Sequence, residues 1–217
     1  SWSSTIPDIA TSGSYSVYAR QVDLAGNISG GTLLEFIRGS AGTDAALAGT
    51  NGADNIYADA GDDTIIGGLG GDFIHGGTGT DSVSYENSSG VTASLKDGEG
   101  SAGDASGDFY FSIENLIGSP GVDTLYGDDN VNTLEGGDDI LMGGDGSDLL
   151  TGGAGADIFY GGDDVSDSPT DTDTVSYFGS NSDVNANLKT GVGSGGDAEG
   201  DEYNGIENLI GWNGNDT

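Results

Sequence analysis

The chain has 217 residues, 43 of them glycine, and its 37 acidic residues against four basic ones give a formal charge of −33. This charge excludes nucleic acid and anionic membrane surfaces as electrostatic partners. The lack of cysteine excludes disulfides and thiolate metal sites, and the single histidine, His75, leaves little material for a zinc site or a catalytic triad. No apolar run is long enough to span a bilayer. We therefore expect a non-enzymatic, monomeric protein with no membrane insertion.

Residues 1–38 differ in composition from the rest of the chain. Alternating apolar and polar residues at 13–20 predict a half-buried strand, and a second strand is predicted at 32–37. The run Y-x-V-x-A-R-x-x-D-x-A-G-N-x-S resembles the last strands of bacterial immunoglobulin-like domains in surface adhesins. A whole sandwich needs about 100 residues, so either these strands belong to a larger domain or they pack on the glycine-rich part of the chain.

Nine-residue units organise two arrays, at 39–84 and 118–164. The first contains GSAGTDAAL, GTNGADNIY, ADAGDDTII, GGLGGDFIH and GGTGTDSVS. The second contains GSPGVDTLY, GDDNVNTLE, a shortened GGDDILM, GGDGSDLLT and GGAGADIFY. The apolar residue at position eight lies in a short extended stretch and is expected to point inward. Two units would then form one 18-residue coil, and stacked coils would bury a shared core.

A longer period of about 93 residues connects the two arrays. The pattern D-x-V-S-Y occurs at 81–85 and 173–177, and I-E-N-L-I-G occurs at 113–118 and 206–211, so segments 85–117 and 165–210 are related. We interpret both as inserts with strands of their own that extend or cap the stack. Residues 211–217 match the start of another unit, so we expect the chain to be part of a longer protein.

The units resemble the RTX (repeats-in-toxin) nonapeptide, G-G-x-G-x-D-x-U-x with U apolar. The resemblance implies an all-β fold, a parallel β-roll in two arrays with β inserts, and calcium held in the turns. It implies one carboxylate from position six of each unit and backbone carbonyls from the glycines of the same and the neighbouring turn. Calcium is a hard cation that takes six to eight oxygens, whereas magnesium demands a tighter octahedron and zinc prefers nitrogen or sulfur.

The candidate ligands are taken from this pattern. The side-chain candidates are Asp54, Asp63, Asp72, Asp81, Asp108, Asp123, Asn132, Asp139, Asp148 and Asp157. The backbone candidates are Gly52, Gly61, Gly68, Gly70, Gly77, Gly79, Gly121, Gly144, Gly146, Gly153 and Gly155. Asn132 lacks the charge, and the shortened unit is expected to distort the stack of Asp123 on Asp139. The sequence leaves the roles of Asp104, Asp197 and Asp201 open.

Three functional hypotheses remain. The first is a structural module of a type I-secreted or cell-surface adhesin, unfolded at low cytosolic calcium and folded by several calcium ions outside the cell. The second is the C-terminal secretion domain of an extracellular lipase, protease or polysaccharide epimerase, with the catalytic part outside this chain. The third is a calcium-dependent surface for glycan, for which Tyr57, Tyr126 and Tyr160 at position nine are candidates. Ice binding would need Thr and Asn in register, and most units lack them.

Overall fold

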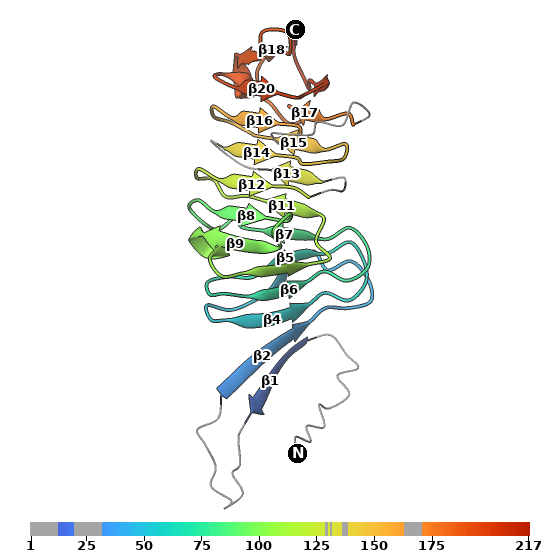
Figure 1. Ribbon diagram of the computed structural model, residues 1–217, viewed down its shortest axis with the longest axis vertical. Coiled ribbons are helices and arrows are strands. Elements are labelled where there is room, and N and C mark those ends of the chain that lie inside the picture. The colour runs from blue at the N-terminus through green and yellow to red at the C-terminus, as the bar shows by residue number, and fades with distance from the viewer. Residues whose placement is uncertain (1–12, 20–31, 129, 131, 136–138, 163–170) are drawn as a thin grey trace, which may run out of the picture.

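In the computed structural model the chain forms one elongated stack of short strands (Figure 1). The structure describes residues 13–19, 32–128, 130, 132–135, 139–162 and 171–217. These residues contain no α-helix and two 3-10 turns, η1 (Gly103–Ala105) and η2 (Gly196–Ala198). No helix long and apolar enough to cross a membrane is found among the described residues. The predicted all-β, parallel β-roll is confirmed.

The strands form two sheets on opposite sides of the stack. The larger sheet has 13 strands in the order β1 (Gly13–Ala19), β2 (Thr32–Arg38), β4 (Asp54–Tyr57), β6 (Phe73–His75), β10 (Phe109–Phe111), β9 (Glu99–Ala102), β8 (Thr92–Ser94), β12 (Thr124–Tyr126), β14 (Ile140–Met142), β16 (Ile158–Tyr160), β20 (Glu202–Asn204), β19 (Val192–Ser194) and β18 (Asn185–Asn187). The smaller has eight, in the order β21 (Asn208–Ile210), β17 (Thr174–Ser176), β15 (Leu149–Thr151), β13 (Thr133–Glu135), β11 (Asn115–Ile117), β7 (Ser82–Ser84), β5 (Thr64–Ile66) and β3 (Leu47–Ala48).

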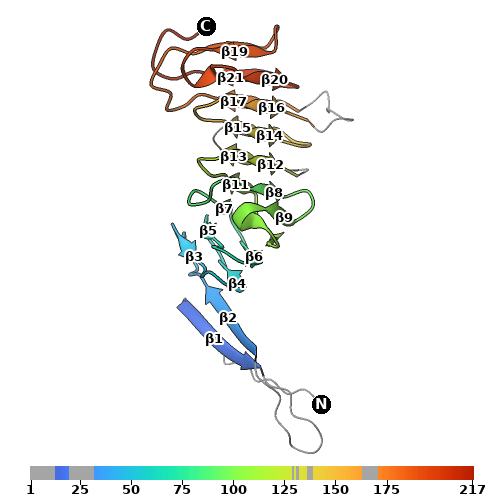
Figure 2. The same ribbon diagram turned by 90° about the vertical axis from the view of Figure 1, so that its left-hand side faces the viewer.

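Successive units alternate between the sheets, so units two apart pair in parallel. Ile56 lies beside Ile74 in one sheet, and Ile65 lies beside Val83 in the other. Figure 2 shows the layers stacked along the long axis, with both arrays in a single roll. The coil of two units predicted from the sequence is therefore the structural repeat.

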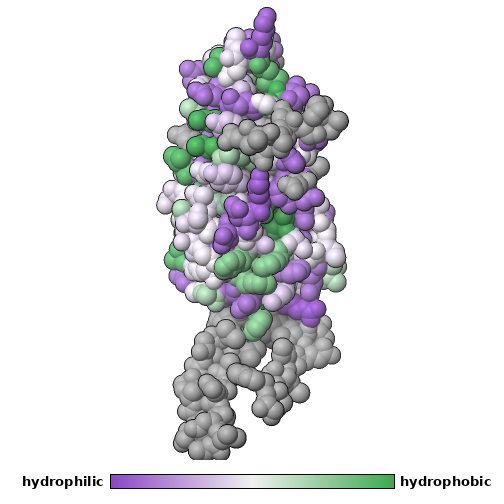
Figure 3. Space-filling view, viewed as in Figure 1, coloured by the Kyte–Doolittle hydropathy of each residue, from purple (hydrophilic) through white to green (hydrophobic). Residues whose placement is uncertain are grey.

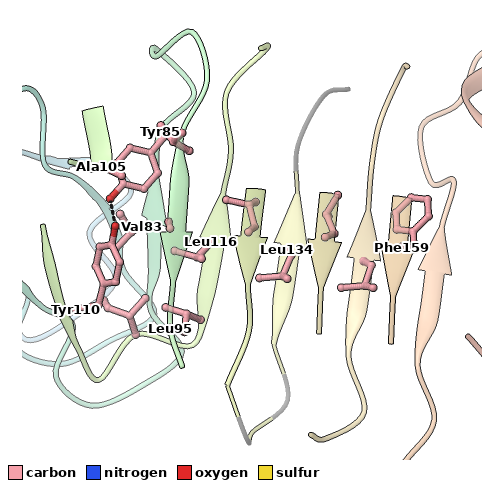
Figure 4. Close-up of a cluster of buried hydrophobic side chains, with 14 of the residues drawn as sticks. Val83, Tyr85, Leu95, Ala105, Tyr110, Leu116, Leu134 and Phe159 are labelled. Carbon is pink, nitrogen blue, oxygen red and sulfur yellow. Dashed lines mark hydrogen bonds between the residues drawn. The ribbon is translucent and has the colours of Figure 1, made fainter. Parts of the chain in front are cut away.

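The core is a single column of side chains between the sheets (Figure 4). The middle residue of each three-residue strand points inward because neighbouring side chains alternate between the two faces of a strand. The position-eight residues of eight units are completely buried: Ile56, Ile65, Ile74, Val83, Leu125, Leu134, Leu150 and Phe159. Leu141 of the shortened unit is equally buried. The inward placement of position eight is confirmed for these units, whereas in the unit 39–47 Ala46 is exposed and Leu47, at position nine, packs against the core.

The first insert extends the roll within the stack. Its strand β10 pairs in parallel with β6 and its strand β8 with β12, while β9 lies antiparallel between them. On the other side of the roll, β11 continues the smaller sheet between β7 and β13. The second insert repeats this arrangement with β18, β19 and β20. The inserts thus bring extra strands into the larger sheet, while the core column stays continuous.

The predicted N-terminal strands are present as an antiparallel hairpin. β1 pairs with β2, and β2 pairs in parallel with β4 at the first coil. Of the two arrangements that the sequence left open, the hairpin therefore packs on the roll. Residues 1–12 and 20–31 lie outside the described residues, and they include residues 20–29 of the run that resembles immunoglobulin-like strands.

Candidate metal sites in the turns

The turns that connect the two sheets form two edges along the roll, and both edges carry the position-six side chains. One edge holds the turns that lead into the larger sheet, such as 67–72 and 152–157. The other holds those that lead into the smaller sheet, such as 58–63 and 143–148. The turns stack because their strands stack, so residues far apart in sequence become neighbours.

On the first edge, the position-six carboxylates that follow Asp54 accept hydrogen bonds from the backbone of the preceding layer. The Asp54 amide donates to Asp72 Oδ1 at 2.9 Å, and the Asp123 amide donates to Asp139 Oδ1 at 2.9 Å. The Asp139 amide continues the series to Asp157 Oδ1 at 2.8 Å. The expected distortion of the Asp123–Asp139 stack by the shortened unit is therefore not observed.

The second edge carries a similar series. The Asp63 amide donates to Asp81 Oδ1 at 2.9 Å, and the Asn132 amide donates to Asp148 Oδ1 at 2.8 Å. These bonds hold one oxygen of each carboxylate in place and aim the other into the turn. We call the two series the carboxylate ladders.

In several turns the second carboxylate oxygen is buried and accepts no hydrogen bond. This is the case for Oδ2 of Asp63, Asp72, Asp81 and Asp148, whose side chains are at most 2% exposed. Burial, with a contribution from neighbouring carboxylates, raises the pKa of Asp72 and Asp81 to about 6 and that of Asp148 to about 7. Leaving such an oxygen buried and unpaired is costly. A cation in the turn would satisfy it.

The glycines of these turns have the backbone conformation that the pattern requires. Eight of the candidate glycines at positions two and four have positive φ: Gly68, Gly70, Gly77, Gly79, Gly144, Gly146, Gly153 and Gly155. A Cβ on Gly77 would collide with the carbonyl oxygen of Asp59 in the preceding layer, and one on Gly144 would lie 2.5 Å from that of Asp128. Backbone carbonyls thus approach the turns too closely for any side chain.

The donors in these turns fit calcium. They are carboxylate and carbonyl oxygens, with no nitrogen or sulfur, which suits a hard cation with a large and flexible shell. Within the described residues no three acidic or histidine side chains converge on one point. Any ion would therefore take much of its coordination from backbone carbonyls, as the RTX resemblance implies.

Three predicted side-chain ligands lie in the ladders but already have protein hydrogen-bond partners for both polar atoms of the side chain. Asp123 accepts from the amides of Val91 (2.7 Å) and Ser119 (2.6 Å). Asn132 accepts from the Asp128 amide at 2.6 Å and donates to the Glu114 carbonyl at 2.9 Å.

Asp108 is the third, and it accepts from the Asp72 amide at 2.8 Å and from the Tyr85 hydroxyl at 2.7 Å.

The three remaining predicted glycines differ in backbone conformation. Gly61 has positive φ, whereas Gly52 and Gly121 do not.

Sequence reasoning missed several members of the ladders. Asp44 accepts from its own turn, and Asp173 accepts from the Asp148 amide at 2.9 Å. Glu114 accepts from the Asp81 amide at 2.8 Å, and Glu207 accepts from the Asp173 amide at 2.9 Å. The signal was present, because both glutamates lie in the repeated I-E-N-L-I-G pattern.

Asp201, whose role the sequence left open, takes the place in the second insert that Asp108 has in the first. It accepts from the Asp157 amide at 3.0 Å and from the Tyr177 hydroxyl at 2.5 Å. Each of these hydroxyls also contacts a second buried tyrosine, Tyr110 in the first insert and Tyr203 in the second. The 93-residue period thus reproduces a complete hydrogen-bonded group.

Comparison with known proteins agrees with this geometry. The family model of the RTX calcium-binding nonapeptide repeat matches residues 48–83, 112–138 and 135–165, which together make up less than half of the chain. No curated protein matches the sequence. The matched segments contain most of the turns just described, and they support calcium as the bound ion and a structural role in a secreted protein.

Proposed function

We propose that this chain is a calcium-dependent folding module of a bacterial protein that acts outside the cell. The observation that carries the proposal is the set of buried carboxylate oxygens that accept no hydrogen bond, on Asp63, Asp72, Asp81 and Asp148. A charge of −33 opposes compaction in the absence of counterions. Bound calcium would supply both the missing partners and the missing positive charge.

The proposed mechanism couples ion binding to folding. The ladders exist only when the coils are stacked, so the binding free energy of each ion contributes to the folding free energy. At the low calcium concentration of the cytosol the chain would stay extended, as type I secretion requires. At the higher concentration outside the cell it would fold.

A calcium titration tests the proposal directly. After chelation, the protein should show a largely unfolded circular dichroism spectrum at neutral pH. Added calcium should produce a cooperative β signal, whereas magnesium at equal ionic strength should produce far less. A β spectrum that is unchanged by chelation and by calcium would contradict the proposal.

For the parent protein we propose a surface adhesin, with the chain itself non-catalytic. The support is the immunoglobulin-like pattern of residues 1–38, whose strand β2 continues into the larger sheet through β4. The alternative parent is an extracellular hydrolase or epimerase that carries this roll at its C-terminal side. The sequence upstream of Ser1 in the parent gene decides between them: tandem immunoglobulin-like domains favour the adhesin, and a catalytic motif favours the enzyme.

An exposed aromatic row supports a second candidate function, the binding of a neutral polysaccharide. On the outer face of the larger sheet, the ring centroid of Tyr57 lies 6.5 Å from that of Phe36 and 5.9 Å from that of Phe73. The ring centroids of Phe73 and Phe111 are 4.6 Å apart. Hydrophobic residues gather over β4 and β6 in Figure 3. Flat rings can stack on sugar faces, and the acidic surface disfavours anionic polymers.

The glycan hypothesis is tested with the calcium-loaded protein on an array of neutral and anionic glycans. Phe111 is 44% exposed, so Phe111→Ala should weaken binding to neutral glycans without changing the calcium titration. Val122→Ala, at a residue 67% exposed and outside the row, serves as the control. Equal binding by wild type and Phe111→Ala would argue against this surface.

A further inference from the structure

The turns of the ladders are of two kinds, distinguished by the backbone conformation of the second residue of the unit. In the first kind, which we call self-closed turns, the amide of residue two donates to the side chain of residue six in the same turn. This bond measures 2.6 Å in the turns 40–44, 50–54, 119–123 and 128–132, and 2.9 Å in the turn 212–216.

Hydroxyl side chains at position two strengthen the closure. Ser119 donates from Oγ to Asp123 Oδ1 at 3.0 Å, and Thr50 donates from Oγ1 to Asp54 Oδ2 at 2.9 Å. In the turn 119–123 both carboxylate oxygens are thereby bound by protein donors. The carboxylate of Asp123 is completely buried and has no unsatisfied oxygen.

In the second kind, which we call open turns, residue two has positive φ and the closing bond is absent. Gly68, Gly77 and Gly144 have φ of +98°, +116° and +107°. Asp59 has φ of +76° although it is not glycine, and its side chain pairs with Arg38 at 2.7 Å. The open turns end in the carboxylates whose Oδ2 accepts no hydrogen bond, namely Asp63, Asp72, Asp81 and Asp148.

The two kinds occupy different places along the roll. Self-closed turns stand at the beginning of each array, at 40–54 in the first and 119–132 in the second, and the turn 212–216 follows the second insert in the same way. Open turns come next. The inserts then satisfy the last carboxylates with hydroxyl groups, through Tyr85 on Asp108 and Tyr177 on Asp201.

We propose that the backbone conformation of the second residue of each unit decides whether the carboxylate of that unit is left for calcium, so that blocks of ion-binding open turns lie next to self-closed turns, of which 119–123 and 128–132 hold no ion. Calcium is ligated by the carboxylates of Asp63, Asp72, Asp81 and Asp148. The carboxylates of Asp108 and Asp123 and the amide of Asn132 take hydrogen bonds in its place. Asn132 fits this assignment because its Nδ2 donates to the Glu114 carbonyl, where a carboxylate would need a cation.

The proposal rests on the proposed function and makes it more specific. The self-closed turns 119–123 and 128–132 need no ion, so they form a ready surface on which the first open turn of the second array can stack. In the first array, the self-closed turn 50–54 keeps Oδ1 of Asp54 buried without a hydrogen bond, so this turn could still contribute one oxygen to an ion. Calcium would then bind first to the open turns that lie next to the self-closed turns of each array. The first insert would separate the open turns of the first array from those of the second.

The first test is an ion map of the wild-type protein crystallised in calcium, with ions assigned by anomalous scattering. We expect ions within coordination distance of the carboxylates of Asp72, Asp81 and Asp148. We expect none at those of Asp108 and Asp123. An ion on the Asp123 carboxylate overturns the proposal but leaves calcium-dependent folding intact, whereas a folded roll with no ion at all contradicts the proposed function itself.

The second test compares Asp148→Asn with its matched control Asp123→Asn, from the same array and likewise buried in the ladders. Native mass spectrometry at saturating calcium counts the ions of each variant. Asp148→Asn should lose one ion, and Asp123→Asn should keep the wild-type number. Loss of an ion from Asp123→Asn, or its retention by Asp148→Asn, overturns the assignment. If either variant does not fold in calcium, the wild-type ion map decides.

Discussion

Tyr85 donates a 2.7 Å hydrogen bond to Oδ2 of Asp108, and both residues are buried between the first array and its insert. The same hydroxyl lies 2.6 Å from that of Tyr110. Burial raises the pKa of Tyr85 well above its usual value, so the hydroxyl stays protonated and able to donate. This bond occupies the carboxylate oxygen that is left unpaired in the open turns.

Removing this hydroxyl should therefore destabilise the protein. Tyr85→Phe leaves the Asp108 oxygen without its donor in a buried site, which costs about 1–3 kcal/mol. Denaturant unfolding at saturating calcium measures the loss. Tyr57→Phe, at an exposed ring, is the control and should change the free energy of unfolding by much less. Equal stability of the two variants would show that the Tyr85 bond is not important.

The calcium-free fold should gain stability on acidification. The pKa values of Asp72 and Asp81, about 6, and of Asp148, about 7, lie above the ordinary value of 3.8 because burial disfavours the charged form. The folded state then binds protons more tightly than the unfolded state. This contribution is fully present below pH 3.8 and is lost as the pH rises through 6 to 7.

Circular dichroism of the chelated protein between about pH 7.5 and pH 4 tests this pH dependence. The β signal should rise as the pH falls, and calcium should bind more weakly at about pH 5 than at about pH 7.5 because protons compete for the same oxygens. A chelated protein that loses β signal on acidification would contradict the prediction.

A methyl group at an open turn should be poorly tolerated. In Gly77→Ala the new Cβ meets the Asp59 carbonyl, and the backbone at φ +116° is unfavourable for alanine. We expect a loss of at least about 1 kcal/mol in stability together with weaker calcium binding, measured by thermal unfolding and calorimetry. Gly42→Ala is the matched control, because nothing lies within 4 Å of its Cβ and its φ is not positive. Similar effects of both substitutions would contradict the close packing of the layers.

The core column should behave as one unit that joins the arrays. Leu134 is completely buried and pairs with Leu116 of the insert region and Leu150 of the next coil. Leu134→Ala should cost about 2–5 kcal/mol because a cavity remains between stacked layers. The midpoint of denaturation in calcium measures this cost. Val122→Ala, 67% exposed, should have little effect, and a similarly small effect of Leu134→Ala would argue against a continuous core.

Much of the fold can be predicted from spacing within the sequence. The nine-residue period places Ile56 and Ile74 one coil apart and assigns both to the core, because a three-residue strand has a single inward position. The same period predicts that Asp54 stacks on Asp72, which the hydrogen bond between them shows. Local rules suffice here because each coil repeats the same backbone path.

The inserts were less predictable. The 93-residue period revealed that they are related, but their antiparallel strands β9 and β19 depend on pairing with strands outside the nine-residue pattern. The place of Glu114 opposite the Asp81 amide likewise arises only when β11 stacks on β7. The repeated I-E-N-L-I-G pattern marks this glutamate as part of a recurring segment, but it does not reveal which backbone amide the carboxylate faces.

The sequence by itself determined the β-roll, the inward positions and the oxygen-rich turns, since these depend on residues at fixed short spacing. Only the tertiary structure decided which of those turns has an unsatisfied carboxylate. Asp123 and Asp148 occupy the same position of the same pattern, yet the first accepts the Ser119 amide and the second has an oxygen with no donor. The difference depends on the backbone torsion of each turn and on the stacking between layers. A buried oxygen needs a hydrogen-bond partner, and whether a donor lies within reach is decided only when the layers are assembled.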